Sequence, residues 1–79
     1  MQILSPDQYR MARVGVKLSV RELAERAGVS THTLNRLENG EELKPKTLQA
    51  IREALEAAGV EFIDENGGGA GVRLKKPLG

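Results

Sequence analysis

Two short helices joined by a very short connection are the feature that most limits the folds open to this chain. The first helix is expected to begin after Ser19, because Glu22 stands three residues further on and completes a capping box. Gly28 follows at a position where a residue with left-handed backbone would end that helix. Ser30 is then expected to cap a second helix, which stops at Gly40. The pattern therefore predicts two short helices separated by a tight turn.

The shortness of the connection decides how these helices pack. They cannot lie antiparallel across it, so they must cross steeply, which is the helix-turn-helix geometry. Ala24 falls where the two helices meet, and a larger side chain there would push them apart. The apolar residues that face inward are Leu23, Ala27, Val29, Leu34 and Leu37.

The opposite face of the second helix is polar. At 3.6 residues per turn it presents His32, Asn35, Arg36 and Asn39, with Thr31 at its leading edge. Side chains of these types form hydrogen bonds with base edges. We therefore predict contacts to DNA bases from Thr31, His32, Asn35 and Arg36.

For these side chains a second interpretation stays open. Arg36 could pair its guanidinium with guanine O6 and N7, or contact a phosphate without reading sequence. Asn35 could read adenine or contact the backbone, and His32 is either a groove contact or a solvated side chain. His32 has no cysteine, second histidine or nucleophile beside which it could form a metal or catalytic site. The sequence thus predicts no metal, no cofactor and no enzymatic activity.

The same run resembles the helix-turn-helix of the Cro/repressor-like (XRE) family of bacterial and phage transcriptional regulators. The resemblance extends from about Tyr9 to about Leu55, most of the chain. It implies sequence-specific binding of double-stranded DNA, with the second helix in the major groove. The matching residues are Leu23-Ala24, Gly28-Val29-Ser30, Leu34 and Arg36-Leu37-Glu38-Asn39-Gly40.

Phosphate contacts are also implied by the resemblance. Relatives contact a phosphate at the start of the first motif helix, which here means Ser19 through its hydroxyl or N–H group. Val20 departs from the family, where a polar residue is common, so we expect Arg21 to substitute for it. Thr33, on the flank of the second helix, is a further candidate for a phosphate or a thymine methyl group.

The helix that Pro45 opens is the second place where relatives contact a phosphate. Lys44 and Lys46 flank its start, where free backbone N–H groups favour an anion. Glu41 and Glu42 oppose this, because basic residues are more usual there. A solvated Lys46 is the alternative.

One ion pair is implied by the resemblance as well. The family often holds an arginine of the first helix against the glutamate that ends the recognition helix, here Arg13 and Glu38. If buried, the pair would fix the angle between helices. The alternative is two independent surface charges.

Two further helices are predicted on either side of the motif. Ser5 caps the first, which should run from Pro6 to about Val14 and end at Gly15. It is expected to bury Tyr9, Val14 and part of Met11. The later helix carries an apolar stripe up to Gly59, formed by Leu48, Ile51, Leu55 and Ala58.

From Val60 the apolar period changes to two. Residues 60–64 and 71–75 are predicted to be strands joined by a glycine-rich loop, with Val60, Phe62, Val72 and Leu74 sharing one face. The loop lacks the Lys-Ser/Thr and following helix of a nucleotide-binding loop. A lone hairpin is marginal, so it must pack on the helices or pair with another chain. We favour an exposed edge that joins its twin across a two-fold axis, and expect residues 75–79 to fray.

Length and composition agree with a small regulator. Seventy-nine residues make one mainly α domain, a four-helix repressor-like DNA-binding unit over residues 1–59 followed by the hairpin and tail over residues 60–79. The chain has no cysteine, no leader and no apolar run of membrane-spanning length, so we expect a cytoplasmic protein. Net charge +1 is weak support for a nucleic-acid partner.

We expect double-stranded DNA and a second copy of the chain as partners, because a single module buries too little surface for useful specificity. Two alternatives remain. The chain could be the antitoxin of a toxin–antitoxin pair, with the hairpin covering a toxin protein. It could also be a protein-interaction module that has lost DNA binding, to which Val20 and the Glu41-Glu42 loop give some weight.

Overall fold

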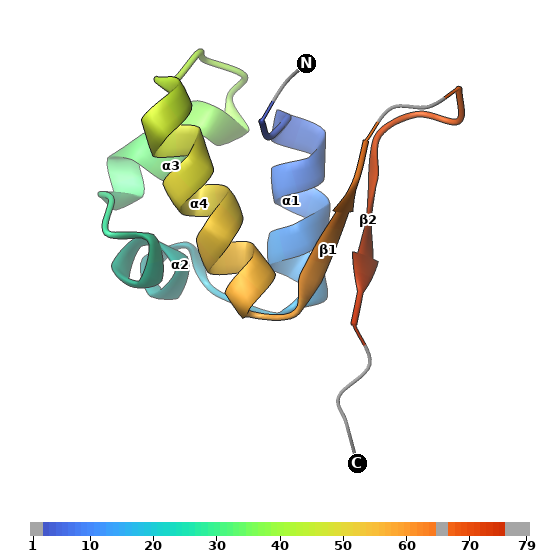
Figure 1. Ribbon diagram of the computed structural model, residues 1–79. Helices are drawn as coiled ribbons and strands as arrows, with labels where there is room; N and C mark the ends of the chain where they lie inside the picture. Colours follow the sequence, from blue (N-terminus) through green and yellow to red (C-terminus); the bar gives the residue numbers. More distant parts are fainter. Residues whose placement is uncertain (1–2, 65–66, 76–79) are drawn as a thin grey trace.

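Four helices followed by a two-stranded antiparallel sheet make up the computed structural model, which describes residues 3–64 and 67–75 (Figure 1). The predicted fold class is therefore confirmed. Of residues 75–79, which we expected to fray, residues 76–79 lie outside the described residues. Lys75 does not fray, because its N–H group is bonded to the carbonyl of Gly59. The elements are α1 (Pro6–Gly15), α2 (Val20–Ala27), α3 (Thr31–Glu38), α4 (Pro45–Ala57), β1 (Val60–Ile63) and β2 (Gly71–Leu74).

The starts of the first three helices carry the predicted serine caps. The hydroxyl groups of Ser5, Ser19 and Ser30 accept hydrogen bonds from the backbone N–H groups three residues further on. In α1 and α2 the side chains of Gln8 and Glu22 accept from the cap residue in return, so both capping boxes are complete.

The ends of α1 and α2 differ in one respect from the prediction. Gly28 ends α2 in the left-handed region at φ 72°, as expected. After α1 the left-handed residue is Lys17, at φ 59°, and Gly15 is the last helical residue. Gly15 serves packing instead, because a Cβ atom there would lie 2.9 Å from a methyl carbon of Leu74 in β2.

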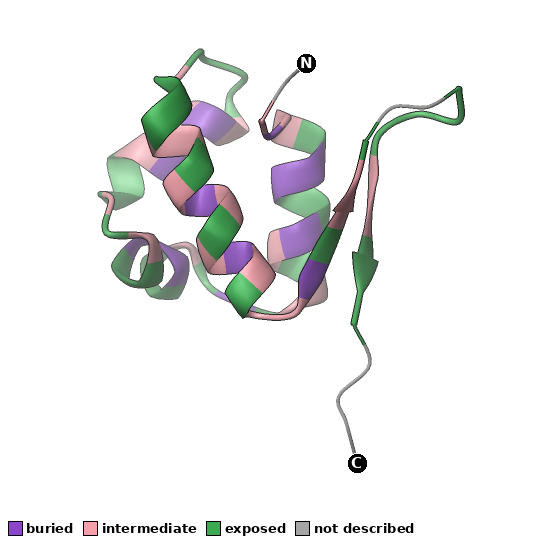
Figure 2. Cartoon of the chain, in the orientation of Figure 1, coloured by how far each residue is buried: buried purple, intermediate pink, exposed green. Residues whose placement is uncertain are grey.

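The apolar core is aliphatic apart from Tyr9. Figure 2 shows that the buried positions are spread over the helices and the start of β1. The burial predicted for Val14 is wrong, because Val14 is 65% exposed, whereas Met11 is partly buried as predicted, at 44% exposed. Val14 lies about 200° around α1 from the buried Ala12 and so points away from the core. The buried apolar residues are Leu4, Tyr9, Ala12, Leu18, Leu23, Ala24, Leu34, Leu37, Ile51, Leu55 and Val60.

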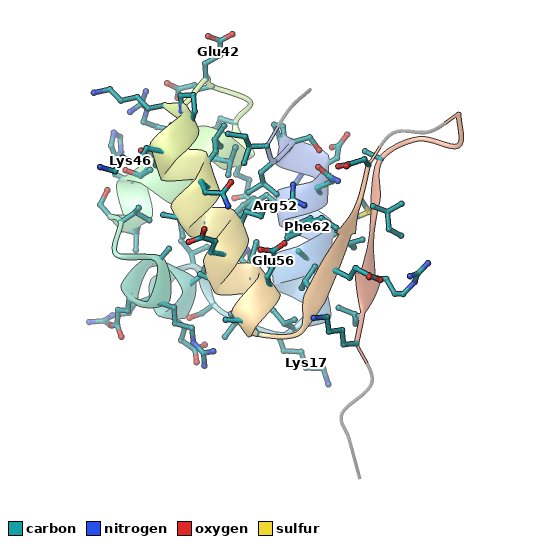
Figure 3. All side chains as sticks on the ribbon, in the orientation of Figure 1. Lys17, Glu42, Lys46, Arg52, Glu56 and Phe62 are labelled. Carbon is teal, nitrogen blue, oxygen red and sulfur yellow. The ribbon has the colours of Figure 1, made fainter. Side chains whose placement is uncertain are left out.

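The hairpin packs on the helices through its predicted apolar face. Val60 is buried, and Phe62 and Val72 pack against the core. The guanidinium carbon of Arg52 in α4 lies 5.0 Å from the centre of the Phe62 ring, a cation–π contact (Figure 3). β2 lies against α1, and β1 against α4. The hairpin is therefore part of the folded unit.

The outer edge of β2 is unpaired within the described part of the chain. In an antiparallel pair of strands, opposite residues alternate between hydrogen-bonded and non-hydrogen-bonded pairs. The N–H group of Lys75 donates to the carbonyl of Gly59 at 2.8 Å, so this pair is hydrogen-bonded and the next pair along the strands is not. By that alternation, the N–H and C=O groups of Val72 and Leu74 point outward from the two-stranded sheet. Such an edge is able to pair with another strand.

No helix in residues 3–64 and 67–75 combines the length and the apolar character needed to cross a bilayer.

Candidate nucleic-acid interface

The outward face of α3 is open. Leu34 and Leu37 anchor the helix in the core, which turns Thr31, His32 and Asn35 to solvent. The side chains of these three residues, and that of Asn39, form no hydrogen bond or ion pair with any other described residue. Hydrogen-bonding groups on an uncovered helix face are what base recognition in a groove requires.

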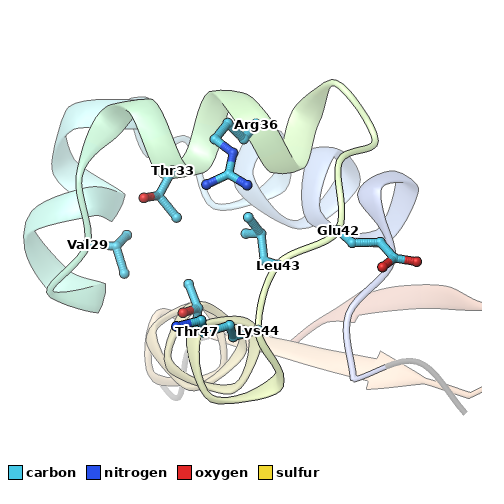
Figure 4. Close-up of a pocket in the computed structure, with 7 residues that line it drawn as sticks. All are labelled: Val29, Thr33, Arg36, Glu42, Leu43, Lys44 and Thr47. Carbon is cyan, nitrogen blue, oxygen red and sulfur yellow. The ribbon is translucent and has the colours of Figure 1, made fainter.

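Arg36 differs from its neighbours on this face. Its Nε atom lies 3.2 Å from Oε1 of Glu41, just beyond the end of α3, and its side chain is 41% exposed. The guanidinium is thus turned toward the flank of α3 instead of straight outward (Figure 4). From the sequence, Glu41 is predicted only to oppose phosphate contact, and its contact with Arg36 is not predicted.

A pocket of about 480 Å³ separates the flank of α3 from the start of α4. Thr33 and Arg36 point into it from α3, whereas the carboxylate of Glu42 points away (Figure 4). The Thr33 hydroxyl also lies 3.0 Å from that of Ser30. The pocket is lined by Val29, Thr33, Arg36, Glu42, Leu43, Lys44 and Thr47.

At the start of α2 the capping box occupies part of the predicted phosphate site. The N–H group of Ser19 donates to Oε1 of Glu22 at 3.0 Å, so only the Ser19 hydroxyl hydrogen remains to be donated. The hydrogen bonds from Ser19 lower the pKa of Glu22, which keeps that carboxylate charged. Val20 packs against the core, which explains an apolar residue beside the cap. Arg21 is exposed and forms no ion pair with a described residue.

The start of α4 has no side-chain cap. Lys44 occupies the cap position without a side-chain hydrogen bond, and Pro45 has no N–H group. The N–H groups of Lys46 and Thr47 therefore have no acceptor within the helix, and they lie at the positive end of the helix dipole. Lys44 and Lys46 are both exposed, and Figure 3 shows Lys46 on the side of α4 away from the hairpin.

Residues 10–62, more than half of the chain, match the helix-turn-helix family, and no curated protein matches the sequence. The matched stretch contains α2, the tight turn and α3 with its open polar face. This chain belongs to the Cro/repressor-like helix-turn-helix family. The family consists of DNA-binding transcription regulators and not of enzymes, so DNA binding is the activity of this class of chain.

In this Cro/repressor-like chain, Arg13 and Glu38 are brought together. Nη2 of Arg13 lies 3.5 Å from Oε1 of Glu38, with the side chains 21% and 33% exposed, so the pair is only partly buried. Nη1 of Arg13 donates to the carbonyl of Leu18, directly before the α2 cap. One guanidinium thus links the end of α3 to the connection between α1 and α2.

Two polar residues of α1 form bonds to distant segments that the sequence does not predict. Nη1 of Arg10 donates to the backbone carbonyl of Glu38 at 2.6 Å, which adds a second bond from α1 to the end of α3. Gln8, which is 5% exposed, donates from Nε2 to the carbonyls of Ile63 and Gly71 in the hairpin. These carbonyls lie 55 or more residues from Gln8 along the chain, so the residues around Gln8 do not predict the two hydrogen bonds.

No group of three or more His, Cys, Asp or Glu side chains that could hold a metal ion occurs in the described part of this helix-turn-helix chain.

Proposed function

We propose that this protein binds double-stranded DNA sequence-specifically, with α3 in the major groove. The observation that carries the proposal is the polar face of α3, which no other described residue covers. Thr31, His32 and Asn35 stand on that face and supply donors and acceptors for base edges. Arg36 supplies a guanidinium at its flank.

Phosphate contacts set the register of α3 in this proposal. They come from the two helix starts beside it and from the pocket between α3 and α4. The contributing residues are Ser19, through its hydroxyl, Arg21, Thr33, Lys44 and Lys46.

An electrophoretic mobility-shift titration tests this function. Sequences bound by the protein are first selected from a random pool, and the preferred duplex is then compared with a random duplex at low and moderate salt. We expect tighter binding of the selected sequence and a fall in affinity with rising salt. Equal binding of both duplexes at low salt would contradict a regulator and favour a module that has lost DNA binding.

We further propose that two copies bind an inverted repeat, with half-sites about 34 Å apart. An eight-residue recognition helix offers few base contacts alone, and a second copy would double them. The surface that we assign to the contact between copies is the free edge of β2 together with Met11, Val14 and Leu74, the exposed large apolar side chains of the described residues. Leu74 packs on Gly15 of α1, so the strand edge and the helix surface adjoin.

Removing the whole hairpin would not test this contact cleanly, because Val60 is fully buried and its loss would disturb the core. The sharper variants are Val14→Lys and Leu74→Lys, which place charges on the exposed apolar side chains. Sedimentation should show a dimer for the wild type and a monomer for the variants. A wild-type dimer that the two variants leave intact would place the contact elsewhere.

The arrangement of the half-sites gives a second readout. α1 and α4 lie between α3 and the hairpin (Figure 1), so pairing along β2 must still direct both α3 helices to one duplex. Cooperative binding to half-sites one helical turn apart is expected. A dimer in solution that binds such half-sites independently would contradict the inverted-repeat proposal.

A protein partner in place of a second copy is the other candidate. β2, which carries the exposed Leu74, lies across α1 and α4 from α3 (Figure 1), so a protein bound along β2 would leave α3 accessible to DNA. This position suits an antitoxin that binds a toxin and regulates its own promoter. Co-purification of a small protein encoded beside this chain, lost in Leu74→Lys, would support it.

A further inference from the structure

The backbone conformation after α3 places Glu41 beside Arg36, independently of the contact between their side chains. Gly40, at φ 85°, follows α3 in the left-handed conformation, and its N–H group bonds the carbonyl of Leu37 at 3.0 Å. The N–H group of Glu41 bonds the carbonyl of Arg36, also at 3.0 Å. These two bonds are the Schellman motif, which fixes the residue after the glycine beside the last turn of the helix. Glu41 therefore stands next to Arg36 because Gly40 ends the helix in this way.

The side-chain contact uses only one nitrogen of the guanidinium. Nε of Arg36 donates to Oε1 of Glu41 at 3.2 Å. Nη1 and Nη2 form no hydrogen bond with any other described residue. The two terminal N–H groups that can bind guanine O6 and N7 side by side are thus left free.

We propose that Glu41 is a positioning residue that presents the terminal nitrogens of Arg36 to a guanine. The assignment rests on the proposed binding of DNA by α3. A free arginine loses side-chain entropy when it is ordered against a base, and a guanidinium already held at Nε loses less. The carboxylate also offsets the positive charge, which weakens the attraction of Arg36 to phosphates of any sequence. Glu41 therefore raises sequence preference more than overall affinity.

A different role for Glu41 predicts a different result. If it only repelled phosphates, its removal would strengthen binding to every duplex and leave the preference unchanged. Glu42 provides the matched control for this effect. It carries the same charge one residue further on, and its carboxylate points away from the pocket and from Arg36 (Figure 4).

The experiment compares wild type, Glu41→Ala, Glu42→Ala and Arg36→Ala on the selected duplex, on a random duplex, and on the selected duplex with 7-deazaguanine at each guanine in turn. We expect wild type to lose about tenfold in affinity when the guanine read by Arg36 loses N7. Glu41→Ala, which removes the acceptor for Nε of Arg36, should lose clearly less at that guanine, with a lower preference for the selected duplex. Glu42→Ala should match wild type in both respects. Thermal melting of each variant checks that the fold is retained.

The outcomes separate this assignment from the function on which it rests. A wild-type protein with no sequence preference overturns the proposed DNA recognition, and the role of Glu41 with it. A wild-type preference that Glu41→Ala leaves intact, at the 7-deazaguanine position included, overturns the role of Glu41 alone. Equal gains of Glu41→Ala and Glu42→Ala on every duplex also overturn it, because they identify a general charge effect.

Discussion

The side-chain nitrogen Nε2 of Gln8 lies 3.2 Å from the carbonyl oxygen of Gly71, and so joins the first helix to the last strand. The same nitrogen donates to Ile63, while Oε1 accepts from the N–H group of Ser5. One buried amide therefore completes a helix cap and holds both strands of the hairpin against α1. A glutamine suits this position because its amide both donates and accepts.

Gln8→Ala should lower the free energy of unfolding by about 2 kcal/mol, since it removes bonds to both strands and half of the capping box. Chemical denaturation measures the change. Gln49→Ala is the matched control, because Gln49 is exposed and its side chain bonds only to Glu53 among the described residues. It should change stability by less than about 0.5 kcal/mol. Similar losses from both variants would show that Gln8 does not hold the hairpin.

The Arg13–Glu38 pair should show coupling in a double-mutant cycle. Arg13→Met removes the contact to Glu38 and the bond to the Leu18 carbonyl, and should cost about 1–2 kcal/mol. Glu38→Gln should cost less, because Glu38 is the more exposed partner. The double variant should be more stable than the sum of the two single losses predicts. Strict additivity would favour two independent charges.

Alkaline stability should depend on Tyr9, the one tyrosine of the chain. Burial raises the pKa of its hydroxyl above the usual 10.0, although the nearby Arg13 lowers it in part. Above pH 10 the unfolded chain therefore releases this proton before the folded protein does, and the free energy of unfolding falls as pH rises. Below pH 10 the hydroxyl is protonated in both states and contributes no pH dependence.

Tyr9→Phe removes the titrating group, and the Tyr9 hydroxyl has no hydrogen-bond partner among the described residues. The variant should match or slightly exceed wild type at neutral pH and lose less stability as the pH rises above 10. Denaturation curves at stepped pH measure this difference. Parallel decline of the two proteins over that range would mean that Tyr9 ionises equally in the folded and unfolded states.

Local chemistry explains what could be predicted from the sequence. Ser5, Ser19 and Ser30 specify helix starts through bonds that span three residues, and Gly28 ends α2 because it tolerates a positive φ. The inward face of the hairpin follows from its period of two. These features need no knowledge of distant residues.

Contacts between distant segments explain what could not be predicted. Gly15 resembles a helix terminator in sequence, but its lack of a side chain makes room for Leu74, while Lys17 takes the left-handed conformation. Val14 is apolar but lies on the exposed side of α1. At the interface, the polar face of α3 followed from helical spacing, whereas the contact of Arg36 with Glu41 depends on the backbone beyond the helix.

The most direct test of the central claim, that α3 reads bases while the start of α4 grips phosphate, compares Arg36→Ala with Lys46→Ala over a range of salt concentrations. Affinities for the selected and random duplexes are measured for both variants by fluorescence anisotropy. Arg36→Ala should reduce the preference for the selected duplex by about tenfold, and Lys46→Ala should weaken both duplexes alike and reduce the salt slope by about one. Equal effects of the two variants on preference and on salt slope would contradict the account.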